Sequence, residues 1–203
     1  KSASRNIRRW CDYGPTLLAT PVHESGVMPG LRYSHQLVPY QLVGAISPWN
    51  FPVALSLIDA VPALLAGCAV FVKPSEVTPR FVEPLKKAIA AVPELARVFA
   101  IEPGDGRTGA ALIGQVDAVC FTGSVATGRK VAVAAAGHFI PAFLELGGKD
   151  PAIILPSANL EDAADAILRG SVVASGQVCL ALERAYVQEA QHEVDLTPVV
   201  GFV

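Results

Sequence analysis

Short apolar runs alternate with longer mixed stretches through the middle of the chain. The apolar runs have the length of buried strands and lie at residues 42–47, 69–73, 96–101, 117–121 and 141–146. The stretches between them are predicted to be helices, at residues 52–66, 79–92, 107–113 and 124–136. Strands that alternate with helices at this spacing predict an α/β fold, a Rossmann-like parallel sheet with helices on both faces.

Prolines, glycines and a threonine mark where the predicted helices begin and end. Pro52 suits the first turn of a helix that Gly67 closes, and Pro62 inside that helix predicts a kink. Thr78 is expected to cap the helix at residues 79–92.

The two ends of the chain do not continue this regular alternation of strands and helices. Residues 4–19 predict a helix, and residues 20–41, interrupted by glycine and proline, predict two strands joined by a turn. Near the C-terminal end, a strand is expected at residues 152–155 and a helix from Asn159 or Leu160 to about residue 171. No continuing helix is expected at residues 188–203, because Pro198 and Gly201 interrupt them.

Composition and charge narrow the class of protein. Hydrophobic residues make up 52% and charged residues 17%, so the chain can bury a sizeable core. A net charge of −2 argues against nucleic acid or an anionic membrane as partner. The four cysteines lack metal-ligand spacing, so neither a metal site nor a disulfide framework is predicted, and a reducing cytoplasm is expected.

One stretch, residues 51–72, is long and apolar enough to suggest a membrane span, with Asp59 as its only charge. Pro62, Gly67 and the strand-like residues 69–72 favour a buried sheet instead. The basic residues 1–9 are not followed by an apolar segment, so no signal peptide is expected.

The loops that follow the predicted strands carry most of the polar and glycine-rich motifs. These loops lie at residues 47–50, 73–76, 103–106, 122–124 and 147–148. Right-handed crossovers bring such loops to one edge of a parallel sheet, where ligands bind. The pattern therefore predicts a ligand site at this edge.

Three residue types suited to chemistry at an aldehyde or acyl carbon occur in the chain. Cys179 follows a Gly-Gln pair and is a candidate nucleophile, although an isolated cysteine is more often a small buried hydrophobe. Glu145, beside two glycines, is a candidate general base. Asn50 offers an amide that can hold an oxyanion, and it is equally typical of a turn.

Five stretches, at residues 48–52, 73–76, 121–128, 145–149 and 176–179, together resemble the NAD(P)-dependent aldehyde dehydrogenase superfamily in order and spacing. The resemblance covers roughly residues 5–187. It implies that Cys179 attacks the aldehyde carbon and forms a thiohemiacetal. It also implies that Glu145 activates water to hydrolyse the thioester, which requires an apolar setting. Asn50 and the backbone N–H of Cys179 would form the oxyanion hole.

The resemblance also assigns the cofactor. The turn from Gly123 to Gly128 opens a helix whose free N–H groups can face a pyrophosphate. Lys73 and Glu76 match the residues that contact the adenosine ribose in the family. The carboxylate of Glu76 would repel the 2′-phosphate of NADP, so NAD is the favoured cofactor, and NADP stays possible. The full set of cofactor-binding residues implied is Ile46, Ser47, Pro48, Trp49, Lys73, Ser75, Glu76, Gly106, Phe121, Thr122, Gly123, Ser124, Gly128 and Leu146.

The resemblance divides the chain into four parts. These are an N-terminal helix (1–19), a β-hairpin that serves as an oligomerisation arm (20–41), a dinucleotide-binding domain (42–146) and the start of a catalytic domain (147–203). It implies a small-molecule aldehyde as substrate and a homo-oligomer, dimer or tetramer, for the full-length protein.

The family's downstream Glu-x-Phe-Gly-Pro stretch does not occur in these 203 residues, so the chain alone is expected to be inactive. The alternative interpretation is a dinucleotide-binding remnant or binding module without turnover. An acylating enzyme with coenzyme A as acceptor is disfavoured, because the water-activating Glu145 favours hydrolysis.

Overall fold

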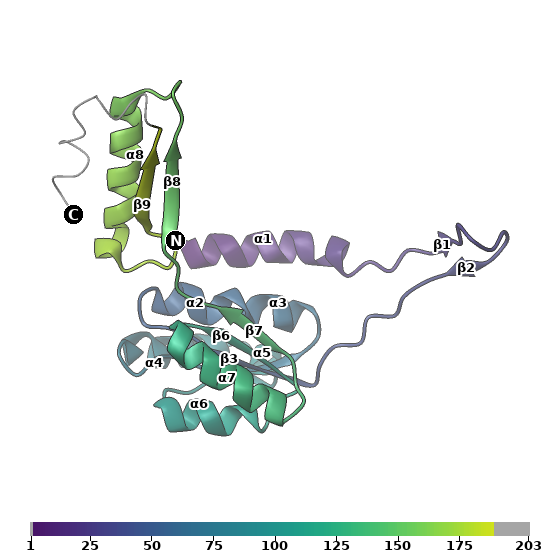
Figure 1. The fold of residues 1–203 in the computed structure, drawn as a ribbon. Coiled ribbons are helices and arrows are strands. Elements are labelled where there is room, and N and C mark those ends of the chain that lie inside the picture. Colours follow the sequence, from purple (N-terminus) through teal and green to yellow (C-terminus); the bar gives the residue numbers. More distant parts are fainter. Residues whose placement is uncertain (1, 189–203) are drawn as a thin grey trace. The chain divides into compact units, whose positions relative to one another are not determined.

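The computed structural model describes residues 2–188 and divides the chain into two compact units, Lys1–Glu145 and Leu146–Val203 (Figure 1). Each unit has its own sheet, and each is described by itself.

The first unit contains a five-stranded parallel sheet, as predicted. Its strands are β3 (Leu42–Ile46), β4 (Ala69–Lys73), β5 (Phe99–Ile101), β6 (Ala118–Thr122) and β7 (Ala142–Glu145). The strand order is β5-β4-β3-β6-β7, so the direction of winding reverses between β3 and β6. Ligands of doubly wound sheets bind at this reversal, outside the carboxyl ends of the strands.

Helices cover both faces of this sheet (Figure 1). On one face lie α2 (Pro52–Ile58), α3 (Ala60–Leu65) and α4 (Val82–Ala90), and on the other lie α6 (Gly106–Ile113) and α7 (Val125–Gly137). The short α5 (Pro93–Ala96) precedes β5. Because side chains alternate along a strand, each strand contributes to both layers.

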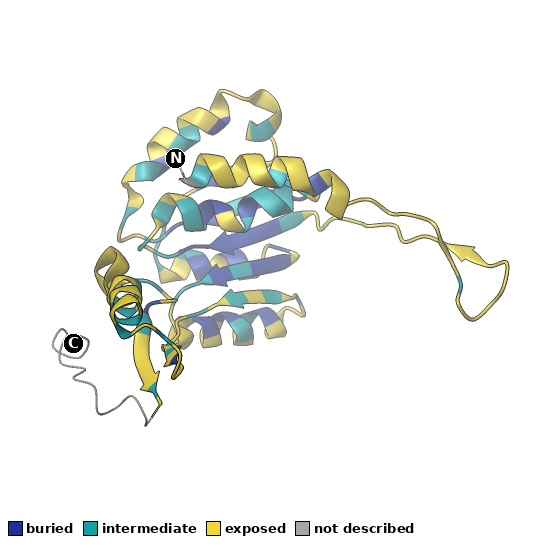
Figure 2. Cartoon of the chain, turned by 90° about the horizontal axis from the view of Figure 1, so that it is seen from above, coloured by how far each residue is buried: buried dark blue, intermediate teal, exposed yellow. Residues whose placement is uncertain are grey.

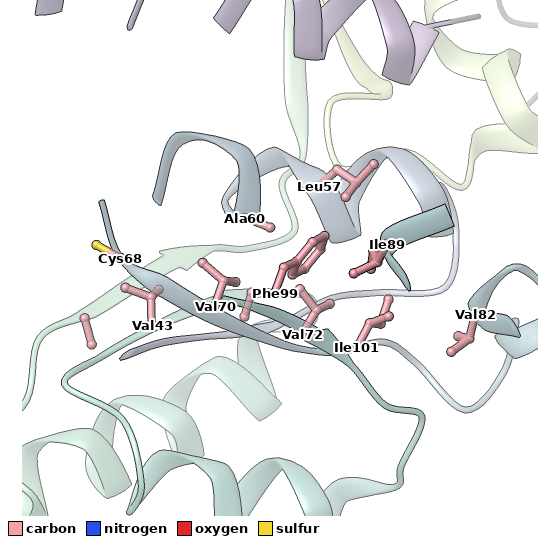
Figure 3. Close-up of a cluster of buried hydrophobic side chains, with 12 residues drawn as sticks. Val43, Leu57, Ala60, Cys68, Val70, Val72, Val82, Ile89, Phe99 and Ile101 are labelled. Carbon is pink, nitrogen blue, oxygen red and sulfur yellow. The ribbon is translucent and has the colours of Figure 1, made fainter. Parts of the chain in front are cut away.

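The hydrophobic core lies between the sheet and the α2–α4 layer (Figure 3). Its strand residues come from alternate positions, and its helix residues include Leu57 and Ala60. The strand members are Val43, Ala45, Val70, Val72, Phe99, Ile101 and Ala118. On the opposite face, Gly44 has no side chain, and a Cβ there would come within 3.1 Å of Val116 and 3.2 Å of Leu112. Glycine at this position therefore allows Leu112 of α6 and Val116 to pack closely on the strand.

The kink predicted from Pro62 is present. The helix expected at residues 52–66 is interrupted at Asp59 and forms α2 and α3, because Pro62 lacks an N–H and its ring crowds the carbonyl four residues earlier. Two other local predictions differ from the structure. The Thr78 cap is wrong: its hydroxyl donates to the carbonyl of Trp49 at 3.0 Å, and a 3₁₀ turn, η1 (Pro79–Phe81), precedes α4. The strand predicted at residues 96–101 begins later, at Phe99, because the first helical turn at Pro93 extends to Ala96.

The N-terminal helix and the arm belong to the first unit. Helix α1 (Ser2–Leu17) packs on α2 and α3, and the arm that follows pairs β1 (His23–Glu24) with β2 (Arg32–Tyr33) antiparallel. The pairing is confined to two residues from each strand, and the arm is exposed along its length apart from Ser25 (Figure 2).

The second unit contains β8 (Asp150–Ile154) and β9 (Leu182–Val187), paired parallel, with helix α8 (Leu160–Val172) and a 3₁₀ turn, η2 (Val173–Gly176). Asn159 caps α8, and its side-chain oxygen accepts from the N–H groups of Glu161 at 2.9 Å and Asp162 at 3.3 Å. The interruption predicted at Pro198 and Gly201 lies outside the described residues.

No helix within residues 2–188 combines the length and apolarity that crossing a bilayer requires. The apolar residues 51–72, which suggested a span, are instead α2, α3 and the central strand β4.

Phe99→Ala is expected to destabilise the first unit, because Phe99 is 6% exposed and packs in the core. The free energy of unfolding should fall by about 3–5 kcal/mol, the usual cost of truncating a buried phenylalanine. Urea denaturation measures this change, with Ala100→Ser, an exposed position of the same strand, as the matched control. A loss of stability no greater than that of the control would contradict the assigned core.

Candidate active site

A cavity of about 570 Å³ opens at the carboxyl edge of the sheet, within the first unit. The ends of β3, β4 and β6 line it together with one face of α6 and one face of α7. It therefore lies at the reversal of strand order, where a ligand is expected. Its size is in the range typical of small-molecule sites.

Most of the residues predicted to bind the cofactor line this cavity. They are Ile46, Ser47, Pro48, Trp49, Lys73, Ser75, Glu76, Gly106, Phe121, Thr122, Gly123 and Ser124. Gly128 does not line it and is buried in the first turns of α7, where its N–H donates to the carbonyl of Ser124 at 2.8 Å. Leu146 belongs to the second unit.

The sequence reasoning missed the helix residues that line the cavity. These are Gly109, Ala110 and Ile113 of α6 and Thr127, Lys130, Val131 and Ala134 of α7. Their spacing of three or four residues puts them on one face of each helix. This periodicity could have identified them once the preceding loops were assigned to the site.

A buried lysine and an exposed glutamate stand at the end of β4. Lys73 is only 5% exposed, and its Nζ donates to the carbonyl of Gly104 at 2.8 Å and lies 3.4 Å from Oε2 of Glu76. A hydrogen bond from its own backbone N–H and the charge of Lys73 lower the pKa of Glu76. Glu76 is therefore ionised at neutral pH and offers an acceptor to hydroxyl groups in the cavity.

The glycine turn after β6 is held by the strand and by the helix that it opens. The N–H of Gly123 donates to the carbonyl of Glu145 at 3.0 Å, and Ser124 caps α7 by accepting from the N–H of Thr127 at 3.2 Å. A Cβ at Gly123 would lie 2.6 Å from the ring of Phe121. Glycine is therefore required here, and the N-terminus of α7 is presented to the cavity.

The loop after β3, which carries Asn50, is anchored on both sides. The hydroxyls of Ser47 and Ser56 lie 2.6 Å apart and are both buried, which ties the loop to α2. The hydroxyl of Thr78 donates a hydrogen bond to the carbonyl of Trp49. The side-chain oxygen of Asn50 is buried. Asn50 is thus fixed next to the cavity-lining residues, although it does not line the cavity itself.

Glu145 ends β7 and pairs in register with Thr122 of β6. The sequence predicted an apolar setting for this carboxylate, but Glu145 is exposed in the structure. The correction has a physical reason: β7 is an edge strand of the sheet, and its outer side has no strand partner among the described residues.

Cys179 lies in the second unit, three residues after the end of η2, and it is exposed. Ala174 and Ser175 in this turn have positive φ values of 50° and 58°. A Cβ at Gly148 would lie 2.9 Å from the carbonyl oxygen of Cys179. The absence of a side chain at Gly148 therefore allows the backbone to approach Cys179 closely.

The other cysteines are less suited to act as nucleophiles. Cys68 is buried in the core. Burial and the nearby charge of Asp59 raise the pKa of Cys120 to about 12, so it is a neutral thiol at physiological pH. Cys11 is exposed on α1. No group of three or more potential metal ligands is found within residues 2–188.

The first unit contains Asn50, Glu145 and all the predicted cofactor residues except Leu146. Leu146 and Cys179 belong to the second unit. Most of the candidate site residues lie at or just after the ends of strands, where binding and catalytic residues are commonly found.

Comparison with known proteins agrees with this arrangement. The sequence profile of the aldehyde dehydrogenase family matches residues 3–198. Geranial dehydrogenase of Castellaniella defragrans is 41% identical over 191 residues, which is 92% of this chain and 40% of that protein.

Solved structures show the same likeness. PutA from Anabaena variabilis superposes with a TM-score of 0.92 and 57% identity, covering 98% of this chain and 42% of that one. A Mycobacterium tuberculosis aldehyde dehydrogenase complexed with NAD⁺ superposes with a TM-score of 0.85 and 31% identity, covering 97% of this chain and 40% of that one.

The chain thus spans about two fifths of the length of these relatives. Within that span the family profile covers nearly all of its residues, including every candidate site residue. The chain therefore belongs to the aldehyde dehydrogenase family.

Proposed function

We propose that this chain supplies the cofactor-binding sheet and the nucleophile of an enzyme that oxidises an aldehyde to a carboxylic acid with NAD. The observation that carries the proposal is the cavity at the reversal of strand order, lined by the loops after β3, β4 and β6. The proposed location is the cytoplasm, where scattered cysteines stay reduced.

The residues of the cavity fit a dinucleotide. Glu76, which is ionised, would accept from the ribose hydroxyls, with Lys73 and Ser75 beside it. The N-terminus of α7 at Gly123 and Ser124 would face the pyrophosphate. Bound NAD supplies the oxidant for the reaction.

Within this proposal, the chain's own residues carry the carbon chemistry. The thiolate of Cys179 attacks the aldehyde carbon, and a carbon–sulfur bond forms. The amide of Asn50 and the N–H of Cys179 hold the oxygen that becomes negative. After oxidation, Glu145 takes a proton from water as the water oxygen attacks the thioester carbon, and Cys179 leaves as the thiolate.

The arm at residues 20–41 is proposed to bind a partner subunit in a homo-oligomer. Its apolar side chains are exposed, with Val27 at 90% and Val38 at 78%. Large apolar side chains that are this exposed are typical of association surfaces. The 203 residues alone are proposed to bind the cofactor without turnover.

Glu76→Gln is expected to weaken NAD binding and to reduce the preference for NAD over NADP. The loss should be about 10-fold to 100-fold, because a charge-assisted hydrogen bond is replaced by a neutral one and the repulsion of a 2′-phosphate is removed. Titration of the chain with NAD and with NADP measures both affinities. Glu94→Gln, an exposed carboxylate of α5, is the control. Equal affinities of the variant and the control would contradict the assigned role.

The activity itself is tested in the full-length enzyme by following reduced nicotinamide with a series of aldehydes. Turnover that depends on aldehyde supports the proposal. Tight NAD binding without turnover for any aldehyde would favour the alternative, a dinucleotide-binding protein that has lost catalysis.

A further inference from the structure

Two loops at the carboxyl edge of the five-stranded sheet are joined by a hydrogen bond. The loop after β3 carries Asn50, and the loop after β4 carries Glu76. The hydroxyl of Thr78 donates to the carbonyl of Trp49 at 3.0 Å, although the two residues are 29 positions apart in the chain. The bond thus connects the loop proposed to hold the oxyanion with the loop proposed to hold the cofactor ribose.

Neither helix capping nor a place in the cofactor cavity accounts for Thr78. Within the described residues, its side chain makes no capping hydrogen bond to η1. Of those residues, Thr78 is not one that lines the cavity of about 570 Å³, and it lines a separate cavity beside Pro52, the first residue of α2. Its hydrogen bond to Trp49 is therefore the contact that ties it to the candidate site.

This hydrogen bond fixes the peptide group that leads into Asn50. The carbonyl of Trp49 and the N–H of Asn50 belong to one planar peptide unit, so a fixed carbonyl direction also fixes where the Asn50 backbone begins. The start of the loop is held separately, because the N–H of Ser47 donates to the carbonyl of Lys73 at 3.1 Å. Thr78 therefore holds the part of the loop that is next to Asn50.

On the other side of the bond, the loop after β4 is tied together by its own side chains. Nζ of Lys73 lies 3.4 Å from Oε2 of Glu76. The N–H of Val77 donates to the hydroxyl of Ser75 at 3.2 Å. A ligand that binds to Glu76 would therefore also restrict Thr78, two residues further along the chain.

We propose that Thr78 is a positioning residue that couples cofactor binding to the placement of the Asn50 amide. Restricting one loop lowers the entropic cost of ordering a second loop that is bonded to it. Cofactor bound at Glu76 restricts Thr78. Thr78 in turn holds the Trp49 carbonyl, which sets the Asn50 amide in place for the oxyanion. This inference rests on the proposed roles of Asn50 and Glu76.

The coupling is tested in the 203-residue chain by NMR, without any assay of activity. The chain contains only three asparagines, Asn6, Asn50 and Asn159, so nitrogen-15 labelling of asparagine gives few side-chain amide signals. Saturating NAD should shift the Asn50 signal, which Asn50→Asp identifies. Thr78→Val should reduce this shift by roughly half or more, because valine lacks the hydroxyl that donates to the loop. Thr78→Ser, which keeps the hydroxyl, should restore the shift.

Thr16→Val, at an exposed position of α1, is the matched control and should leave the shift unchanged. Equal shifts in Thr78→Val and in the unchanged chain would overturn the proposal. So would NAD binding that does not move the Asn50 signal in the unchanged chain. If NAD does not bind at all, the proposed cofactor site is wrong and the inference falls with it.

In the full-length enzyme, Thr78→Val should lower kcat by about 3-fold to 10-fold, the factor that the loss of one hydrogen bond allows. The loss should appear in kcat more than in the KM for NAD, because Thr78 lies outside the described cavity. Thr78→Ser should recover the rate. In an Asn50→Ala background, Thr78→Val should cause no further loss, since the residue that it positions is gone. A further loss of the same size would overturn the proposal.

Failure of this inference and failure of the proposed function give different results. If Asn50 does not stabilise the oxyanion, Asn50→Ala keeps the rate of aldehyde oxidation, while the NMR shift still depends on Thr78. If Asn50 does stabilise it and Thr78 does not act on Asn50, the rate is lost in Asn50→Ala, and both rate and shift survive in Thr78→Val.

Discussion

Cys179→Ser is expected to remove nearly all aldehyde oxidation when the chain is assayed within the full-length enzyme. The serine hydroxyl is not ionised at neutral pH and is a far weaker nucleophile than a thiolate. The steady-state rate should fall by about 10⁴-fold or more, the scale found when a covalent nucleophile is removed. Absorbance of reduced nicotinamide measures the loss.

The matched control for this variant is Cys11→Ser, which changes the other exposed cysteine. It should keep normal turnover, because Cys11 lies on α1 and lines no part of the described cavity. NAD affinity should be unchanged in both variants. If Cys179→Ser turned over as fast as the control, the proposed nucleophile would be wrong.

Glu145→Gln is expected to separate the two halves of the reaction. Formation of the thioester does not need a water-activating base, so a burst of reduced cofactor, stoichiometric with the enzyme, should remain. Hydrolysis of the thioester does need it, and the steady-state rate should fall by about 10²-fold to 10⁴-fold, the usual contribution of a general base. Rapid mixing resolves the burst from the steady state.

Two other outcomes for Glu145→Gln are informative. Loss of both the burst and the steady state would place Glu145 in an earlier step, such as activation of the thiol. An unchanged steady-state rate would exclude it as the base. Glu183→Gln is a suitable control, because Glu183 is a carboxylate of the second unit that forms an ion pair with Lys149.

Much of the fold could be predicted from the sequence, because the signals are local. The strand at Ala69–Lys73 has the bounds expected from its apolar run. Ser124 and Asn159 cap their helices through their own side chains, a property that depends on residues two or three positions away. The glycine at position 123 is likewise explained by the ring of Phe121, two residues before it.

The local errors have a different origin, since they arise where a tertiary contact or a second local preference overrides the expected signal. Thr78 is a suitable cap, yet its hydroxyl bonds to Trp49, a residue far from it in the sequence. At Pro93, the preference of proline for the first turn of a helix prevails over the strand that the following apolar residues suggest. The tertiary partner or the stronger backbone constraint decided each case.

For the candidate site, too, one part could be predicted from the sequence and another part depended on the tertiary structure. The order of motifs along the chain identified Lys73, Glu76, Gly123 and Asn50 and placed them after strands, because the chain itself carries that information. Only the tertiary structure showed the strand order, in which β3 and β6 become neighbours and bring their loops to one cavity. Pairing between distant strands depends on the packing of both sheet faces.

Asp59 and Glu145 are the clearest example of what the sequence alone did not determine. In the sequence, Asp59 is one charge in an apolar stretch, and the family resemblance implies that Glu145 is a base in an apolar setting. In the folded chain Glu145 is exposed at an edge strand and its charge acts on the half-buried Asp59. Solvation and the distances between charges belong to the packed structure, and no local pattern of residues encodes them.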